Sequence, residues 1–323
     1  MKNYNFVIYS HCPQIKKKNI MFTKILTMSL LILYVTAIDN CNILSLSGGG
    51  SFGAVEAGIL KDLVDKNKIN STFDMITGIS AGGLNTAFLS YDNNLSNSID
   101  SLIDIYQKLN TKSIYSKNSI RDIYKEWGFY DTTPLENTII DVLRTIVKQD
   151  NSTIPISLIG ASNLNLEKLD IFRYDLADFD NKINILMATS AIPLLFPPRK
   201  IDEYTYVDGG AIDNEIIYQA MGFINCNFYN FTFVSASDKS VDYQSINSYK
   251  DYIHGVYKLV VNTFDYELAG LQNITCSLPR GNINICLPQA EMLEDYSILD
   301  FDHGKELVDI GRNYYTCDQV PLC

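Results

Sequence analysis

The stretch TGISAGG, residues 77–83, matches the pattern G-x-S-x-G. In a nucleophile elbow the chain turns sharply from a strand into a helix, so the positions on either side of the serine must be small. Gly78 and Gly82 meet this requirement, and the serine of such a turn adopts strained backbone angles that hold its hydroxyl clear of the sheet. The stretch therefore predicts a strand–turn–helix unit with Ser80 as the candidate nucleophile.

A second glycine-rich turn lies about thirty residues earlier, in LSLSGGGSFG, residues 44–53. The apolar residues 42–46 predict a strand, and residues 52–64 predict a helix that begins beside Gly53. Glycines leave backbone N–H groups accessible, and the N-terminus of the following helix adds partial positive charge. A developing oxyanion is stabilised by such groups. The candidate oxyanion donors are Gly48, Gly49 and Gly50.

The third motif is YVDGGA, residues 206–211. A short apolar strand carries Asp208 at its end, and Gly209 and Gly210 allow the backbone to turn away. A carboxylate that accepts a hydrogen bond from a serine hydroxyl can act as its general base without a histidine. Taken singly, each motif has a simpler interpretation, because a triple glycine can also cradle phosphate and Asp-Gly-Gly is common in turns. The three together, in this order, favour a hydrolase.

With these motifs the chain resembles the patatin-like phospholipases, a family of lipid acyl hydrolases. Two further blocks support the resemblance, which spans roughly residues 42–236: ATSAIP (188–193) with FPP (196–198), and Asp-Gly-Gly followed by Asn214. The resemblance implies that Ser80 is the nucleophile, that Asp208 is its partner and that phospholipids or related glycerolipids are substrates. One position departs from the family, which usually carries Arg or Lys where this chain has Phe52. The backbone donors remain, but a positive charge is lost.

Strands alternate with helices along the chain, which predicts a three-layer α/β/α sandwich with a mostly parallel central sheet, patatin-like in its motifs. The composition, with 46% hydrophobic residues, allows a large core, and no linker divides residues 38–323, so we expect one catalytic domain. The remaining expected strands are 155–162, 168–173, 204–207, 228–235 and an edge strand at 283–287. The remaining expected helices are 83–89, 99–109, 134–147, 183–191, 215–221, 249–271 and 304–313.

Two irregular segments leave alternatives open. Residues 111–133 are aromatic and charged and contain the only tryptophan. In this family such an insertion often covers the site, and the alternative is a surface excursion packed by its own aromatic rings. Residues 194–196 are large and apolar and lie in a proline-bounded turn. They form either a wall for an acyl chain or part of the core.

The N-terminus predicts entry into the secretory pathway. Residues 1–37 contain five lysines and no acidic residue, and a run of about ten apolar residues precedes a small-residue exit. This is the pattern of a signal peptide. Its shortest form spans residues 21–37, and residues 1–20 are then an upstream extension. The alternative is an uncleaved signal anchor, for which the apolar run is short. We expect the protein to be secreted or to reside in the lumen of the secretory pathway.

Cysteines and glycosylation motifs agree with an oxidising compartment. Removal of residues 1–37 leaves six cysteines, four of them in the last fifty residues, so the C-terminal segment is expected to be disulfide-rich. Six cysteines allow fifteen pairings, of which Cys276–Cys286 and Cys317–Cys323 merely close the shortest loops. The candidate glycosylation sites are Asn70, Asn94, Asn151, Asn230 and Asn273.

Charge limits the partners. The net charge is −11 and becomes −16 without residues 1–37, which disfavours nucleic acid and anionic membrane leaflets. A lipid enzyme with this charge is expected to meet its substrate through apolar contacts at a neutral or zwitterionic membrane or micelle surface. The sequence shows no metal-ligand spacing, and the expected chemistry requires no cofactor.

Two other functions are alternatives for this sequence. A Ser-His-Asp hydrolase would need His254 or His303, but His254 lies within a helical pattern and His303 on a charged loop, where a solvated role is simplest. A catalytically weak or inactive lipid-binding or storage protein on the same scaffold is favoured only by Phe52. The intact Ser80, Asp208 and flanking glycines speak for the enzyme.

Overall fold

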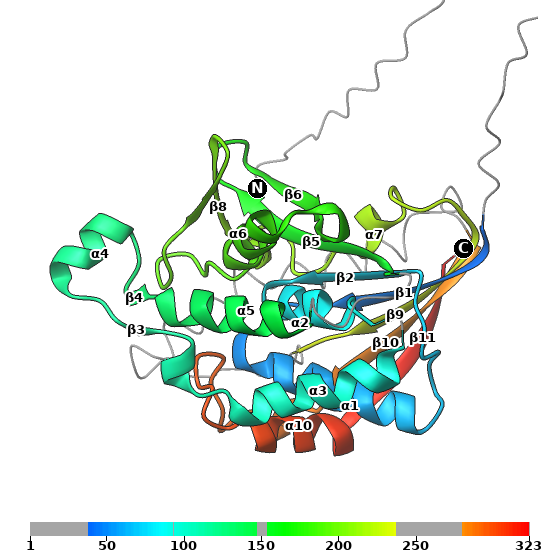
Figure 1. The fold of residues 1–323 in the computed structure, drawn as a ribbon. Helices are drawn as coiled ribbons and strands as arrows, with labels where there is room; N and C mark the ends of the chain where they lie inside the picture. Colours follow the sequence, from blue (N-terminus) through cyan, green and yellow to red (C-terminus); the bar gives the residue numbers. More distant parts are fainter. Residues whose placement is uncertain (1–37, 93, 147–153, 237–279, 323) are drawn as a thin grey trace, which may run out of the picture. The chain divides into compact units, whose positions relative to one another are not determined.

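A computed structural model of the chain describes residues 38–92, 94–146, 154–236 and 280–322. Its main sheet has nine strands (Figure 1). The path β11-β10-β9-β1-β2-β5-β8-β7 runs across the sheet, and β6 pairs with β5. The strands are β1 (Ile38–Leu46), β2 (Met75–Ile79), β5 (Ile156–Asn163), β6 (Lys168–Arg173), β7 (Arg199–Ile201), β8 (Tyr204–Asp208), β9 (Cys226–Val234), β10 (Arg280–Pro288) and β11 (Tyr315–Leu322).

The centre of the sheet is parallel. Strands β10, β9, β1, β2 and β5 pair in parallel, while β6, β7, β8 and β11 are antiparallel to their neighbours. Every residue of β2 is buried, as expected for a strand that is covered on both faces. The prediction of a mostly parallel central sheet is confirmed.

Helices cover both faces of this sheet, which gives the three-layer α/β/α arrangement. The larger core packs Leu44 and Leu46 of β1 against helices on one face. Ile43, which points the opposite way, packs against Ile216 and Ile217 at α7 on the other. The helices are α1 (Gly53–Asp65), α2 (Ser80–Leu89), α3 (Leu95–Lys108), α4 (Ile120–Glu126), α5 (Thr133–Ile146), α6 (Phe179–Thr189), α7 (Ile217–Ala220) and α10 (Gly304–Asn313).

Most expected elements lie within a few residues of their predicted bounds, and α10 and β6 match them. The expected helix at 249–271 and the predicted signal peptide lie outside the described residues, as do Asn151, Asn273, Cys276 and Cys323. Among the helices that the structure describes, none is long and apolar enough to cross a bilayer.

One strand prediction is wrong. Residues 283–287 were expected at the sheet edge, but β10 lies between β9 and β11, and β11 is the edge strand. The sequence YTCDQVPL of β11 contains a proline and an aspartate, which weaken a strand signal but are tolerated at an edge.

Two disulfides tie the strands together. Cys41 of β1 bonds to Cys226 of β9, and Cys286 of β10 bonds to Cys317 of β11. The second bond excludes both short-loop pairings, Cys276–Cys286 and Cys317–Cys323. In each case the partners are brought together by strand pairing and not by closeness in sequence.

We expect the Cys286–Cys317 bond to stabilise the edge of the sheet. It spans 31 residues, so replacing both cysteines by serine should lower the free energy of unfolding by about 3–4 kcal/mol. Urea unfolding followed by circular dichroism measures this. A loss below about 0.5 kcal/mol, the range of an ordinary surface substitution, would contradict the expectation.

Candidate active site

Ser80 sits where β2 gives way to α2. Its φ of +51° is left-handed, which a non-glycine residue adopts only when its surroundings impose it. The neighbouring glycines make the turn possible. A Cβ on Gly78 would lie 2.2 Å from the carbonyl oxygen of Gly82, and one on Gly82 would lie 2.5 Å from that of Ser47. Backbone packed this closely leaves no room for a side chain at either position.

Ser80 contacts a buried carboxylate. Its Oγ donates a hydrogen bond of 2.6 Å to Oδ2 of Asp208, the last residue of β8, whose side chain is 1% exposed. The other carboxylate oxygen accepts from the backbone N–H of Gly210 at 2.9 Å. The backbone N–H of Asp208 in turn donates to the carbonyl of Ala191 at 2.9 Å. The backbone and the side chain of Asp208 are thus both held by hydrogen bonds, and one carboxylate oxygen is directed at Ser80.

Burial is the main cause of the raised pKa of Asp208. Removal of the carboxylate from water raises its pKa to about 7, and the hydrogen bonds from Ser80 and Gly210 oppose that rise. A group with a pKa near neutrality can both accept and return a proton at physiological pH.

The glycine-rich loop lies beside the elbow. The backbone N–H of Gly48 donates to Oδ1 of Asn214 at 3.1 Å, and the amide of Asn214 donates to the Gly48 carbonyl at 3.2 Å. Gly82 N–H donates to the carbonyl of Ser47, which joins the loop to α2. The N–H groups of Gly49 and Gly50 have no acceptor within the described part of the chain. Gly50 also has a φ of +59°.

Two residues that the sequence analysis did not single out support the serine and the loop. The hydroxyl of Thr189 accepts from the backbone N–H of Ser80 at 2.9 Å and donates to the carbonyl of Gly160 at 2.6 Å. Thr189 lies in the ATSAIP block of the sequence, but that motif alone does not indicate the role of the Thr189 hydroxyl. Glu56, in the first turn of α1, accepts from the backbone N–H of Ser47 at 2.8 Å.

Glu56 begins a buried chain of hydrogen bonds beneath the loop. Its second carboxylate oxygen accepts from the side-chain amide of Asn85, whose oxygen accepts from the hydroxyl of Tyr106 at 2.7 Å. Burial raises the pKa of Glu56 well above its usual range, against the hydrogen bonds from Asn85 and Ser47. An acidic residue within the apolar stretch GAVEAGIL was the available sequence signal, because a buried charge needs partners.

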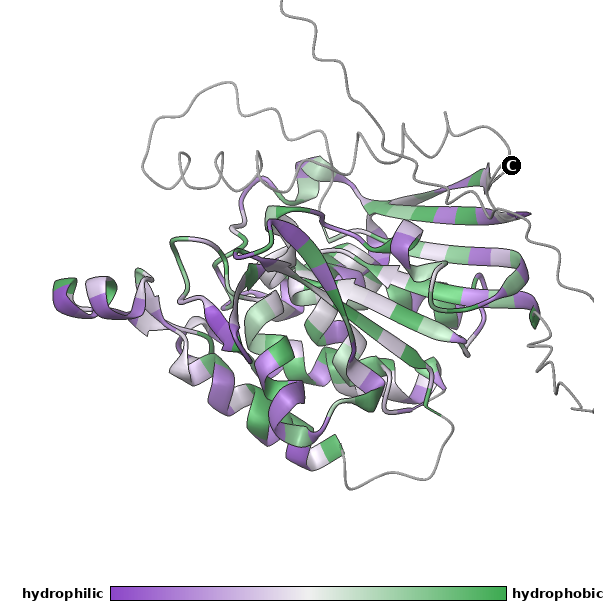
Figure 2. Ribbon diagram, turned by 90° about the horizontal axis from the view of Figure 1, so that it is seen from above, coloured by the Kyte–Doolittle hydropathy of each residue, from purple (hydrophilic) through white to green (hydrophobic). Residues whose placement is uncertain are grey.

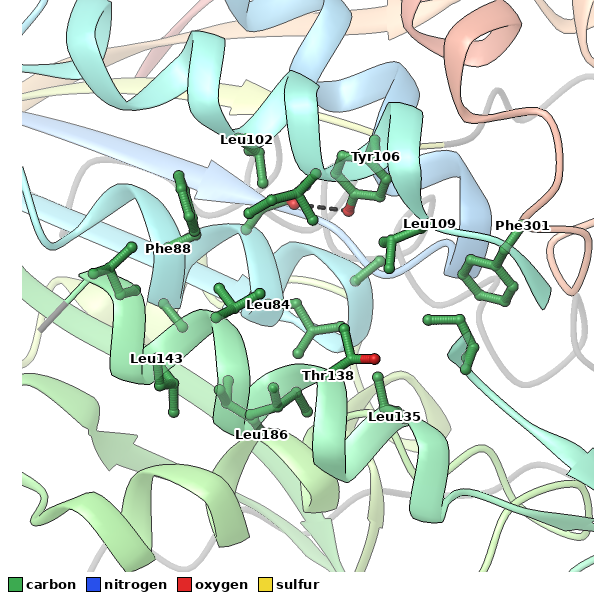
Figure 3. Close-up of a pocket in the computed structure, with 18 of the residues that line it drawn as sticks. Leu84, Phe88, Leu102, Tyr106, Leu109, Leu135, Thr138, Leu143, Leu186 and Phe301 are labelled. Carbon is green, nitrogen blue, oxygen red and sulfur yellow. Dashed lines mark hydrogen bonds between the residues drawn. The ribbon is translucent and has the colours of Figure 1, made fainter. Parts of the chain in front are cut away.

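An apolar cavity of about 90 Å³ opens beside Gly50 of the loop and Ala81 of the elbow. It runs between α2, α3 and α5 (Figure 3) and is closed by side chains such as Leu84, Phe88, Leu102, Leu143 and Leu186. The Tyr106–Asn85 hydrogen bond lies along its wall. Leu195 and Phe196 do not line this cavity but pack with Ile192 in a separate small cluster, so they are core residues. Leu194 is exposed.

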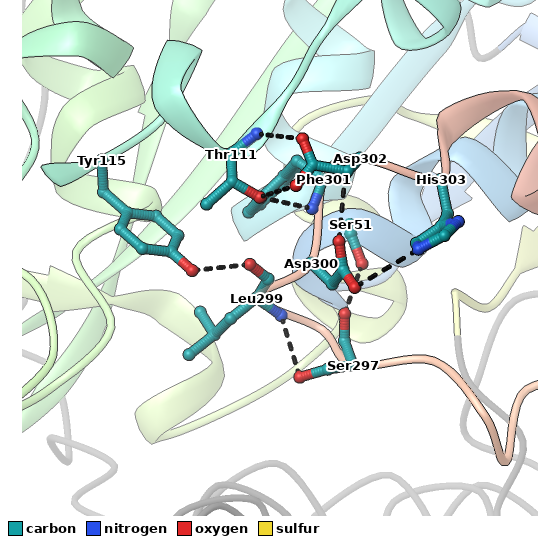
Figure 4. A network of polar contacts seen from close by, with 9 residues as sticks. All are labelled: Ser51, Thr111, Tyr115, Ser297, Leu299, Asp300, Phe301, Asp302 and His303. Carbon is teal, nitrogen blue, oxygen red and sulfur yellow. Dashed lines mark hydrogen bonds and ion pairs between the residues drawn. The ribbon is translucent and has the colours of Figure 1, made fainter.

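The loop before α10 holds the glycine-rich loop from the other side. The backbone N–H of Ser51 donates to the carbonyl of Ile298 at 2.8 Å, and its hydroxyl donates to that of Ser297 at 2.9 Å. Figure 4 shows the same loop bound to Thr111 and Tyr115. His303 lies here, half exposed and 3.6 Å from Asp300. The carboxylate next to His303 is therefore Asp300, whereas Ser80 is hydrogen-bonded to Asp208. His254 lies outside the described residues.

The remaining candidate positions are also placed. Phe52 is buried in the larger core, and its backbone N–H donates to the Gly49 carbonyl. Asn70 is exposed, and Asn94 is half-buried where it caps α3. Asn230 lies in β9, an inner strand of the sheet, which is a poor position for a glycan.

The model of the Patatin-like phospholipase family matches residues 44–221, which include every motif described above. The chain belongs to the patatin-like phospholipase family. Over 222 residues it is 27% identical to the probable lipid hydrolase 463L of Invertebrate iridescent virus 6, covering 67% of this chain and 74% of that protein. Over 135 residues it is 26% identical to the uncharacterized protein R571 of Acanthamoeba polyphaga mimivirus, covering 40% and 44%.

Two solved structures are more distantly similar. VipD from Legionella pneumophila aligns with a TM-score of 0.35 and 10% identity, over 87% of this chain and 68% of VipD. ExoU from Pseudomonas aeruginosa, solved in complex with SpcU, aligns with a TM-score of 0.32 and 15% identity, over 88% and 55%.

We expect the Thr189 hydroxyl to hold the elbow in its strained form. Thr189→Val keeps the shape but leaves the Ser80 N–H and the Gly160 carbonyl without their partner, so it should lower the free energy of unfolding by about 1–3 kcal/mol. The substitution should also lower kcat, by a larger factor than the factor by which KM changes. Thr189→Ser, which keeps the hydroxyl, is the matched control and should lose less of both. Equal losses for the two variants would contradict this role.

Proposed function

We propose that this protein is a serine acyl hydrolase that releases fatty acids from phospholipids or related glycerolipids by a Ser80–Asp208 dyad. The observation that carries the proposal is the 2.6 Å hydrogen bond from Ser80 Oγ to the buried Asp208 carboxylate, at a strained strand-to-helix turn. Membership of the patatin-like phospholipase family supports lipid hydrolysis in general. The viral relative described as a probable lipid hydrolase supports it as well.

The first half of the reaction is acyl transfer to the enzyme. Asp208 takes the Ser80 proton while Oγ attacks the ester carbonyl carbon, and the carbonyl oxygen becomes an oxyanion. The N–H groups of Gly49 and Gly50, which have no acceptor among the residues that the structure describes, are the proposed donors to it, since Asn214 already engages that of Gly48. The C–O bond to the alcohol then breaks, and Asp208 returns the proton to the leaving oxygen.

The second half releases the fatty acid. Water attacks the acyl-serine carbonyl and gives its proton to Asp208, and the same backbone groups hold the second oxyanion. The bond to Ser80 Oγ then breaks, Oγ recovers its proton, and the fatty acid leaves. One carboxylate therefore serves as base and acid in both halves, which suits a pKa near 7.

The apolar cavity is the proposed site of the acyl chain, because its lining includes Gly50 of the glycine-rich loop and Ala81, the residue after the nucleophile. Its volume holds about six water-sized groups, and a methylene is of similar size. A short acyl chain fits without movement, whereas a long chain must displace the walls formed by α3 and α5.

The alternative of an inactive lipid-binding or storage protein rested on Phe52. The Phe52 side chain lies in the core, and the loop that carries the proposed donors is held by Asn214 and by Ile298. The missing basic side chain thus leaves the Ser80–Asp208 contact intact, so we favour the enzyme.

We also propose that residues 38–323 form the catalytic domain and that residues 1–37 direct it to the secretory pathway. The Cys41–Cys226 and Cys286–Cys317 disulfides are compatible with an oxidising compartment.

The dyad is tested by substitution. Ser80→Ala and Asp208→Asn should each lower the hydrolysis of a short-chain phosphatidylcholine at least about a thousandfold, because nucleophile and base act as a unit. His254→Ala and His303→Ala should retain activity within about twofold. Release of fatty acid by folded variants measures this. Loss of turnover in either histidine variant, or its persistence in Asp208→Asn, would overturn the dyad.

The pH profile tests the base. Asp208 must be ionised to accept the serine proton, so kcat/KM for an uncharged ester should rise about tenfold per pH unit below pH 7 and level off above it. Glu56→Gln is the control for the other buried carboxyl group, and its profile should keep the same inflection. A profile that is flat between about pH 5 and pH 9 would show that no group with this pKa is required.

A further inference from the structure

A projecting segment stands beside the active site. We call residues 116–131 the arm: β3 (Ser116–Lys117) and β4 (Tyr130–Asp131) pair as a short antiparallel ribbon, and α4 lies between them. The arm extends from the body in both views (Figures 1 and 2). No residue of α4 is buried. The segment projects from the body, and the expectation that its own aromatic rings pack together holds at its base, where the ring centroids of Tyr115 and Tyr130 lie 4.5 Å apart. At its tip, Tyr124 and Trp127 are exposed.

Three of the four large apolar residues at α4 are exposed, and the fourth, Ile123, is half-buried. Ile120, Ile123, Tyr124 and Trp127 follow the i, i+3, i+4, i+7 spacing of one helix face. Ile120 is 79% exposed, Tyr124 80% and Trp127 67%. Such a stripe normally faces a core, so this helix presents outward the surface that a helix usually buries.

The acidic residues of α4 border a groove between the arm and the body. Asp122 and Glu126 line this groove together with Asp131, Glu136 and Arg199 of the body. Trp127 ends α4 with a φ of +60°, a position where glycine is usual and a bulky side chain is strained.

The base of the arm is hydrogen-bonded to two segments, the turn after Ala191 and the loop before α10. The backbone N–H groups of Phe129 and Tyr130 donate to the carbonyls of Leu194 and Leu195, in the turn that follows Ala191, the partner of Asp208. In the loop before α10, the carbonyl of Leu299 accepts a hydrogen bond of 2.8 Å from the hydroxyl of Tyr115. The preceding residue, Ile298, holds the glycine-rich loop.

The path from the arm to the cavity is short and apolar. Ile114, just before the arm, lines the cavity with Leu135 and Phe301. The arm also differs from the whole chain in net charge. The arm carries three basic and three acidic residues and is neutral, whereas the whole chain carries a net charge of −11. A neutral element suits a lipid surface without net charge.

We propose that the arm docks on a zwitterionic lipid surface, with Ile120, Tyr124 and Trp127 inserted at the level of the head groups. Tryptophan and tyrosine favour this interface because an apolar ring carries a polar edge, and Arg121 and Lys125 flank the stripe where lipid phosphates lie. The docked arm brings the cavity rim to the surface from which an acyl chain is taken. This inference rests on the proposed lipid substrate.

The only tryptophan of the chain provides the probe. Phosphatidylcholine vesicles are added to the full chain carrying Ser80→Ala, so that nothing is hydrolysed and binding is independent of the proposed catalysis. We expect a blue shift of tryptophan emission as Trp127 leaves water, together with co-sedimentation of protein and vesicles. Ile120→Ser with Tyr124→Ser should weaken the apparent vesicle affinity about tenfold or more.

The control replaces an exposed aliphatic–aromatic pair away from the arm, Leu176→Ser with Tyr218→Ser, which are 73% and 50% exposed, and should bind like the parent. An unchanged emission spectrum without co-sedimentation would overturn the proposal, and so would equal losses in the arm and control variants. The parent chain could instead self-associate without binding vesicles, while the arm variant does not self-associate. That result would show that the stripe contacts a second copy of the chain, and it would also overturn the proposal. Hydrolysis of a soluble ester by the unmodified protein tests the proposed function separately.

Discussion

The hydrogen bond between Ser80 and the buried carboxylate of Asp208 is the constraint on which the rest of the site depends. The carboxylate must be buried for its pKa to approach neutrality, and it must still meet a hydroxyl that stands at the end of another strand. The sheet satisfies both conditions, because β2 and β8 both flank β5. The strained turn at Ser80 is held by Thr189 and by two glycines that pack against backbone.

The part of the chain before α10 links three features that are separate in sequence. Ser297 and Ile298 bind Ser51 of the glycine-rich loop, and Leu299 binds Tyr115 at the base of the arm. The same residues lead into α10 and then into β11, which the Cys286–Cys317 bond fastens to β10. The C-terminal disulfide thus stabilises an edge whose preceding loop supports both the proposed oxyanion donors and the proposed lipid-docking arm.

Much of this could be predicted from local pattern. The positions of Ser80, Asp208 and the glycine-rich loop follow from motifs whose backbone requirements are visible in the sequence, and the parallel centre of the sheet follows from alternating elements. The roles of Glu56 and Thr189 could not, because a buried hydrogen bond depends on which distant groups the fold brings together. The same holds for the disulfide partners and for β11, whose weak strand pattern is overcome by pairing and by a covalent bond. The solvent-facing stripe of α4 was unpredictable, since the same spacing ordinarily marks a core helix.

The most direct test of the central claim is reaction of the purified full chain with a fluorophosphonate, followed by peptide mapping, with the folded Asp208→Asn variant beside it. A phosphonate captures only a serine that a neighbouring base has activated. We expect the adduct on Ser80 in the parent chain and its loss in the variant. An adduct that persists in Asp208→Asn would contradict the role of the carboxylate. A folded parent chain that forms no adduct would contradict the claim that Ser80 is an activated nucleophile.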